Sequence, residues 1–182
     1  MLMKPSQSFL LVVDVQEKLA PAVDGIDGVI DNIVRLITAA DKLHIPIIFT
    51  EHCPDRIGHT VNVLVDLVAN GSVVEKSRFS AYSETSIAQH FAALNREQVI
   101  VAGTEAHVCV LQTAIDLKQA GYQPYLVADG TSSRHLDNKK LAIERMRESD
   151  IDIVSTEMVI FEWLERGDTD AFRELLPLIK NC

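Results

Sequence analysis

The chain has 182 residues, of which 47% are hydrophobic and 24% charged, and its formal net charge is −9. This length and composition predict one globular domain over residues 1–182, which buries about 70% of the surface of the unfolded chain. The acidic balance and the lack of clustered Lys and Arg argue against a nucleic-acid partner and disfavour an anionic lipid surface.

Location and redox state can also be predicted from the sequence. No apolar stretch of signal-peptide length precedes the first expected strand, and no run approaches membrane-spanning length, so we expect a cytoplasmic protein without a membrane partner. The three cysteines, Cys53, Cys109 and Cys182, form no CxxC pair and are odd in number. They indicate neither a disulfide framework nor a thiolate zinc site, and we expect reduced thiols.

Six short segments are expected to form β-strands. Residues 9–13 are a continuous apolar run without alternation, which is typical of a strand covered on both faces in a parallel sheet. The other expected strands are residues 45–50, 72–75, 98–102, 123–128 and 151–154.

Apolar residues at helical spacing predict helices between these strands. The first begins at Ile26, repeats apolar residues from Val29 to Ala40, and should end before Pro46. Further helices are expected at residues 61–69, 85–94, 107–120, 137–147 with Asp137 as N-cap, 156–166, and 170–176, which Pro177 should end or kink. Residues 51–59, 76–82 and 129–134 are expected to form polar loops.

Strands that alternate with helices at this spacing predict an α/β fold with three layers, α/β/α, in which helices cover both faces of a parallel sheet, as in Rossmann-like proteins. The first strand leads into Asp14, and neither GxGxxG nor GxxxxGK[ST] occurs in the chain. The sequence therefore implies no nucleotide cofactor.

Three side chains with complementary chemistry follow expected strands: Asp14, Lys76 and Cys109. Ligands in parallel sheets bind beyond the carboxyl ends of the strands. Cys109 falls in the first turn of an expected helix, where free N–H groups and the helix dipole favour a thiolate at neutral pH. Asp14 could accept the thiol proton and Lys76 could stabilise the thiolate, so Cys109 could attack a carbonyl carbon.

Each of the three residues also has a structural explanation. Asp14 could cap a helix, Lys76 could be a solvated surface cation, and Cys109 could pack as a small apolar side chain. Their coincidence at one edge of the sheet favours a catalytic site.

Three motifs carry a resemblance to a known family. They are residues 11–16 (LVVDVQ), Glu75-Lys76 with Phe79 and Tyr82, and residues 103–110 (GTEAHVCV). In their order and approximate spacing, these motifs resemble those of the isochorismatase-like cysteine hydrolases. The similarity spans roughly residues 8–160. Residues 103–113 and 129–134 most resemble the isochorismatase-domain-containing subgroup, whose substrates are poorly defined.

This resemblance implies a six-stranded parallel sheet of order 3-2-1-4-5-6 and an Asp14-Lys76-Cys109 triad. It also implies a cis peptide bond between Thr104 and Glu105, and an oxyanion hole formed by the backbone N–H groups of Glu105 and Cys109. The implied reaction is hydrolysis of a small amide, or of a related C–N or ester bond, through a thioester. A homo-oligomer, a dimer or larger, would fit the family.

Four residues are candidates to contact a small-molecule substrate: Gln16, Phe79, Tyr82 and Thr104. The side chain of Glu105 is a further candidate to line the pocket, and packing is the alternative for the aromatic residues.

A metal is not expected. Nicotinamidases of the superfamily bind an ion through an Asp-x-His pair and a further His after the second strand, whereas this chain has Glu51-His52 and His59 there. Adjacent residues on an extended segment point to opposite sides, so Glu51 and His52 should not share an ion.

True isochorismatases act on a vinyl ether without the cysteine, so Cys109 argues against that reaction.

Two other functions stay open at this point. The site could be catalytically silent in an oligomeric interaction protein, or Cys109 could pair with Cys53 in a thiol redox sensor. The redox alternative would leave Asp14 and Lys76 unexplained.

Overall fold

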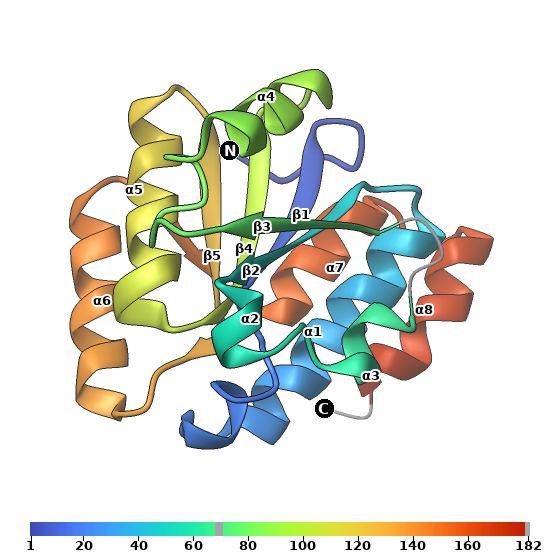
Figure 1. Cartoon of the computed structure of the whole chain (residues 1–182). Coiled ribbons are helices and arrows are strands. Elements are labelled where there is room, and N and C mark those ends of the chain that lie inside the picture. Colours follow the sequence, from blue (N-terminus) through green and yellow to red (C-terminus); the bar gives the residue numbers. More distant parts are fainter. Residues whose placement is uncertain (68–70, 181–182) are drawn as a thin grey trace.

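The computed structural model describes residues 1–67 and 71–180 and is built on one parallel sheet (Figure 1). The sheet has six strands in the order β3-β2-β1-β4-β5-β6, which confirms the expected architecture. Its strands are β1 (Ser8–Val13), β2 (Ile47–His52), β3 (Ser72–Lys76), β4 (Gln98–Thr104), β5 (Gln123–Ser132) and β6 (Asp152–Val154). Strand order reverses at β1, which pairs with both β2 and β4, and such a switch point is where open α/β sheets bind ligands.

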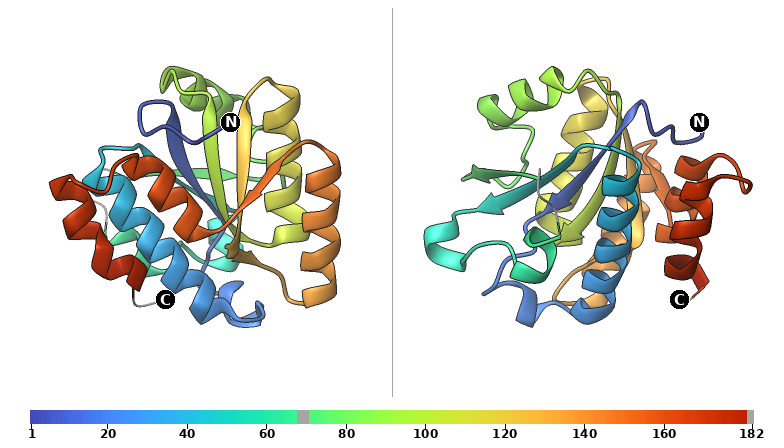
Figure 2. Two further views of the ribbon diagram at one scale, coloured as in Figure 1. Left: turned by 180° about the vertical axis from the view of Figure 1, so that it is seen from behind. Right: turned by 90° about the vertical axis from the view of Figure 1, so that its right-hand side faces the viewer.

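Helices cover both faces of the sheet (Figure 2). One face carries α1 (Ile26–Lys42), α3 (Asn62–Val65), α7 (Thr156–Leu164) and α8 (Asp170–Lys180), and the other carries α4 (Thr85–Ala93), α5 (Leu111–Gln119) and α6 (Leu136–Glu148). Successive residues of β1 enter different cores: Val12 packs with Ile33 and Trp163, whereas Leu11 packs with Phe91 on the opposite face. Every residue of β1 is therefore buried, as its unbroken apolar run predicts.

Several predicted boundaries are wrong around the carboxyl ends of the strands. Residues 51–59 are not one loop, because β2 continues to His52 and a short helix, α2 (Pro54–Ile57), follows. Residues 129–134 were expected to be a loop, but β5 runs to Ser132. The register between β4 and β5 shifts, so that Val101 pairs with Leu126 while Gly103 pairs with Thr131. Extra residues in β5 therefore form a bulge, and the strand continues into the polar segment 129–134 instead of ending before it.

Helix boundaries differ from expectation as well. Of residues 61–69, the structure shows a helix at Asn62–Val65, and residues 68 and 69 lie outside the described ranges. The N-cap of α6 is His135, and Asp137 lies in its first turn. Pro177 does not end α8, which continues to Lys180 because Leu175 and Ile179 are buried on either side of it. Within residues 1–67 and 71–180, no helix is both long and apolar enough for a membrane span.

Candidate active site

Asp14 directly follows β1 and is completely buried. Its backbone has a φ of 48°, an uncommon conformation that Asp tolerates better than most residues. Two threonines hold it: the Thr104 hydroxyl donates to the Asp14 carbonyl at 2.8 Å, and the Thr50 hydroxyl donates to Oδ1 at 2.6 Å. The Asp14 N–H also donates to the carbonyl of Thr50 at 3.1 Å. Strand β2 thus holds the carboxylate and the backbone N–H of Asp14, and β4 holds its backbone carbonyl.

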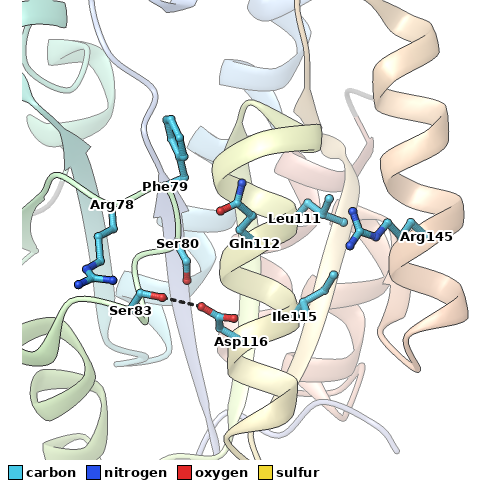
Figure 3. A pocket seen from close by; sticks show the side chains of 9 residues that line it. All are labelled: Arg78, Phe79, Ser80, Ser83, Leu111, Gln112, Ile115, Asp116 and Arg145. Carbon is cyan, nitrogen blue, oxygen red and sulfur yellow. Dashed lines mark hydrogen bonds between the residues drawn. The ribbon is translucent and has the colours of Figure 1, made fainter.

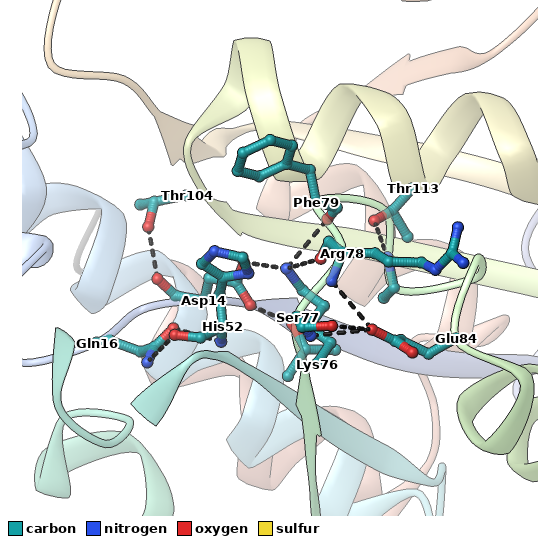
Figure 4. Close-up of polar contacts among 12 residues, drawn as sticks. Asp14, Gln16, His52, Lys76, Ser77, Arg78, Phe79, Glu84, Thr104 and Thr113 are labelled. Atoms are coloured by element: carbon teal, nitrogen blue, oxygen red, sulfur yellow. Dashed lines mark hydrogen bonds and ion pairs between the residues drawn. The ribbon is translucent and has the colours of Figure 1, made fainter. Parts of the chain in front are cut away.

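Lys76, the last residue of β3, forms a buried ion pair with Asp14 (Figure 4). Its Nζ lies 2.6 Å from Oδ2 of Asp14, and both side chains are 0% exposed. The same ammonium donates to the carbonyls of Arg78 at 3.2 Å and Phe79 at 3.0 Å. A buried charge pair needs such additional hydrogen bonds, because it has lost its hydration.

Cys109 lies in a π-helical turn, Ala106–Val110, that joins β4 to α5. Cys109 is 7% exposed, and its thiol interacts electrostatically with both Asp14 and Lys76. Burial raises the pKa of this thiol to about 12, the Asp14 charge acts in the same direction, and Lys76 opposes both. The predicted resting thiolate at neutral pH is therefore wrong, because desolvation of the sulfur and the neighbouring carboxylate outweigh the helix-end effect.

The segment before Cys109 is tightly constrained. Gly103 has a φ of +118°, and a Cβ built there would lie 2.1 Å from the carbonyl oxygen of Val13. The peptide bond between Thr104 and Glu105 is cis. The N–H groups of Val108 and Val110 both donate to the Glu105 carbonyl, and the Glu105 carboxylate accepts from Nε of Arg134 at 2.8 Å. The backbone on the amino-terminal side of the thiol is thus fixed from several directions.

Two of the expected substrate contacts serve other roles. The Gln16 amide is fully buried, donates to the carbonyls of His52 and Gly58, and accepts from the His52 N–H at 2.7 Å. Gln16 therefore ties the segment after β1 to the end of β2. The hydroxyl of Thr104 is likewise occupied by its bond to Asp14.

The two aromatic candidates lie in different places. Tyr82 packs against Phe91 and Tyr122, which both contact Phe9 near the amino end of β1, the end opposite to Asp14. Phe79 is 51% exposed and stacks on His52, with ring centroids 5.4 Å apart. Of the four candidates, Phe79 alone presents an exposed side chain beside the Asp14–Lys76 pair.

Glu51 and His52 separate as expected from their adjacent positions. The buried Glu51 carboxylate accepts from the Thr60 N–H at 2.6 Å and from the Thr60 hydroxyl, and it pairs with Nδ1 of His59 at 2.9 Å. Burial acts to raise the pKa of Glu51, but these hydrogen bonds bring it below its ordinary value. Among the residues that the structure describes, no three His, Cys, Asp or Glu side chains are grouped to hold a metal ion.

Sequence patterns assign no role to several residues that shape this site. Thr50 was expected only as a strand end, and Arg134 only as part of a polar loop. The His107–Ser133 pair, with Nδ1 and Oγ 3.0 Å apart, was also missed. The common signal is a polar side chain at the carboxyl end of a strand, which gives the location but not the partner.

Comparisons with known proteins identify the family. The protein-family model described as the isochorismatase domain matches residues 8–158 of this chain. The chain belongs to the isochorismatase family. Isochorismatase domain-containing protein 2 of Danio rerio is 34% identical over 175 residues, covering 96% of this chain and 87% of the relative. The resemblance inferred from the three motifs is confirmed.

Solved structures of isochorismatase-like proteins share the whole fold. The MAR1 ribonuclease from Caenorhabditis elegans aligns with a TM-score of 0.93 and 34% identity over 99% of this chain and 93% of that one. YcaC from Escherichia coli, described as an octameric hydrolase of unknown specificity, aligns with a TM-score of 0.91 and 20% identity, covering 100% and 94% of the two chains. A cysteine hydrolase from Pseudomonas syringae aligns with a TM-score of 0.82 and 16% identity, covering 89% of this chain and 94% of that one. This isochorismatase-family protein therefore has the fold of proteins described as hydrolases.

Proposed function

We propose that this isochorismatase-family protein hydrolyses a small amide, or a related C–N or ester bond, with Asp14, Lys76 and Cys109 as its catalytic triad. The observation that carries the proposal is the buried ion pair of 2.6 Å between Asp14 and Lys76 beside a buried thiol. A thiol, a carboxylate and an ammonium within reach of one another supply a nucleophile, a proton acceptor and a fixed positive charge.

The first half of the reaction forms a thioester. Cys109 is protonated at rest, so Asp14 accepts the thiol proton as Sγ bonds to the carbonyl carbon of the substrate. The ammonium of Lys76 offsets the negative charge on the sulfur during this transfer. When the tetrahedral intermediate collapses, the C–N bond breaks and Asp14 returns the proton to the leaving amine.

The second half hydrolyses the thioester. Asp14, ionised again, accepts a proton from a water molecule whose oxygen bonds to the acyl carbon. The C–S bond then breaks, the proton goes back to the sulfur, and a carboxylic acid is released. One carboxylate serves both halves, as a cycle of acylation and deacylation requires.

The backbone N–H groups of Glu105 and Cys109 are our candidates for the oxyanion hole. N–H groups in the first turn of a helix lack partners within the helix, and one such donor is typically worth about 3 kcal/mol to the transition state. The bond between the Glu105 carboxylate and Arg134 supports this role, because it restrains the residue that carries one of the donors.

Ribonuclease activity, named for the C. elegans neighbour, is not proposed for this chain. RNA binding uses clustered basic residues, and the net charge here is −9. A buried thiol paired with a carboxylate is suited to acyl transfer rather than to phosphodiester cleavage.

The proposal can be tested by trapping the acyl-enzyme. We expect incubation with p-nitrophenyl acetate to add one acetyl group to Cys109, detected by mass spectrometry of peptides, and the adduct to be lost on further incubation. Cys109→Ala should form no adduct, while Cys53→Ala should behave as the parent. Hydrolysis of a panel of primary amides should follow the same pattern.

Other outcomes would favour the alternatives. Failure of Cys109 to acylate with any ester or amide would favour a catalytically silent interaction protein. A Cys53–Cys109 disulfide under mild oxidation, together with inert esters, would favour the redox sensor; the structure shows both thiols free.

A further inference from the structure

Thr50 of β2 contacts Asp14 through both its backbone and its side chain. Its carbonyl accepts from the Asp14 N–H at 3.1 Å, and its hydroxyl donates to Oδ1 of Asp14 at 2.6 Å. Thr50 pairs with Val13, the residue before Asp14, so the register of β1 and β2 places the hydroxyl against the carboxylate. Because Thr50 is 0% exposed, bulk water does not compete for the hydroxyl proton.

The second carboxylate oxygen of Asp14 has different surroundings. Oδ2 lies 2.6 Å from Nζ of Lys76, and apart from this ion pair it has no hydrogen-bond partner among the described residues. The ammonium also donates to the backbone carbonyls of Arg78 and Phe79. A carboxylate oxygen has two lone pairs, so Oδ2 keeps a site at which it can accept a further proton.

The bond from Thr50 has two consequences for this carboxylate. A hydrogen bond to a charged acceptor is stronger than one to a neutral acceptor, so the hydroxyl favours the ionised form of Asp14. It also restrains rotation about the Cβ–Cγ bond of Asp14, which would exchange the two oxygens. When Oδ2 carries a proton, Oδ1 is a carbonyl oxygen and still accepts from Thr50, so the restraint persists in both protonation states.

Thr50 does not itself reach a substrate. A pocket of about 420 Å³ lies over α5, beside the candidate active site, and Thr50 is not among the residues that line it (Figure 3). We infer that Thr50 is a positioning residue, whose hydroxyl holds Oδ1 and leaves Oδ2 of Asp14 as the oxygen that accepts the proton of Cys109 and returns it to the leaving amine. This inference rests on the proposed hydrolysis.

The first test removes the hydroxyl and measures hydrolysis of p-nitrophenyl acetate. We expect Thr50→Val to lower kcat about 10- to 100-fold, the usual effect of losing a hydrogen bond to a charged group. KM should change little, because the side chain does not touch the substrate. Thr50→Ser keeps the hydroxyl and should recover most of the rate. Thr50→Ala also lacks the hydroxyl, and it gives the same comparison if valine disturbs the packing.

The pH dependence separates positioning from a general loss of structure. Lys76 of β3 and Cys109 of the turn before α5 are the titratable groups that the described structure places against Asp14, and Thr50→Val retains both. Because the variant loses a donor to the ionised carboxylate, the acidic limb of kcat/KM should move to higher pH, and Thr50→Ser should restore it. Partial unfolding would lower the rate without moving this limb.

Thr156→Val is the matched control. The Thr156 hydroxyl also donates to a carboxylate, Oδ1 of Asp129 at 3.0 Å, from a position that is 3% exposed and outside the site. Its kcat and pH profile should equal those of the parent. An unchanged kcat and acidic limb in Thr50→Val, or equal changes in both variants, would overturn the inference while leaving the hydrolysis intact. A parent protein that is no more active than Cys109→Ala would refute the proposed function, and the role of Thr50 with it.

Discussion

At the scale of single residues, Asp14 has two opposing effects on Cys109. Its negative charge raises the pKa of the thiol, which makes the free nucleophile scarcer at rest. The same carboxylate is the proposed acceptor of the thiol proton. The site therefore favours a neutral thiol until a substrate is present, and the reactivity of the free enzyme toward alkylating agents should not parallel its rate of hydrolysis.

Asp14→Asn separates these two effects. Removing the carboxylate charge while Lys76 keeps its own should lower the pKa of Cys109, so alkylation by iodoacetamide should reach its midpoint at lower pH than in the parent. Lys76→Met should shift the midpoint upward, because the ammonium is the group that lowers this pKa. Peptide mass spectrometry can follow Cys109, with Cys53 as an internal reference.

Amide hydrolysis should respond differently from alkylation. Asp14→Asn should lose about 10² to 10⁴ in rate, the usual contribution of a general acid–base group, although its thiol ionises more readily. Circular dichroism of each variant would control for folding, because breaking a buried ion pair costs about 3–5 kcal/mol. If Asp14→Asn lowered the pKa of the Cys109 thiol and kept full activity, Asp14 would not be the acid–base group of the reaction.

At the scale of elements, the end of β4 positions the nucleophile. Gly103 lies against the backbone of Val13 on β1, and the chain then passes through the cis bond to the π-helical turn that holds Cys109. Thr131 of β5 supports the same point, because its hydroxyl donates to the Gly103 carbonyl at 2.6 Å. Three neighbouring strands thus meet at one glycine.

Gly103→Ala should destabilise the protein strongly. The new Cβ would lie 2.1 Å from a backbone oxygen that cannot move without shifting β1, so we expect a loss of at least about 3 kcal/mol in the free energy of unfolding. Gly121→Ala is the matched control: φ there is +93°, but no atom lies within 4 Å of the added Cβ. It should lose only about 1–2 kcal/mol, from backbone strain alone. Urea denaturation of both variants measures this difference, and equal losses would contradict the steric explanation.

At the scale of the whole molecule, several large apolar side chains are exposed on the helices. Leu136 and Leu141 of α6 are 48% and 63% exposed, and Met158 and Phe161 of α7 are 48% and 44% exposed. The two pairs lie on helices that cover opposite faces of the sheet, so each pair is a separate candidate for a subunit contact, and we propose that the protein forms a homo-oligomer.

The oligomer can be tested by mass. Light scattering after size exclusion should give a mass at least twice the 20.2 kDa of one chain, stable to dilution into the low micromolar range. A mass of one chain at every concentration would contradict the proposal and would leave the exposed side chains of α6 and α7 as single surface residues.

The sequence pattern by itself determined a parallel sheet covered on both faces and placed the candidate site at the carboxyl ends of its strands, whereas the strand order was implied by the family resemblance. Unbroken apolar runs require strands covered on both faces, and alternation with helices requires parallel crossovers, so Asp14, Lys76 and Cys109 had to follow strands at one edge. Local pattern is sufficient here because each inference depends on residues close together in the chain.

The tertiary structure alone decided what those residues contact. The burial of Cys109 beside Asp14 reversed the predicted thiolate, and Gln16 and Thr104 proved to bind backbone groups brought in from β2 and β1. The bond from the Thr104 hydroxyl to the Asp14 carbonyl joins residues 90 positions apart. Desolvation, ion pairing and side-chain hydrogen bonds depend on distances across the fold, and these are fixed only when the strands and helices have packed.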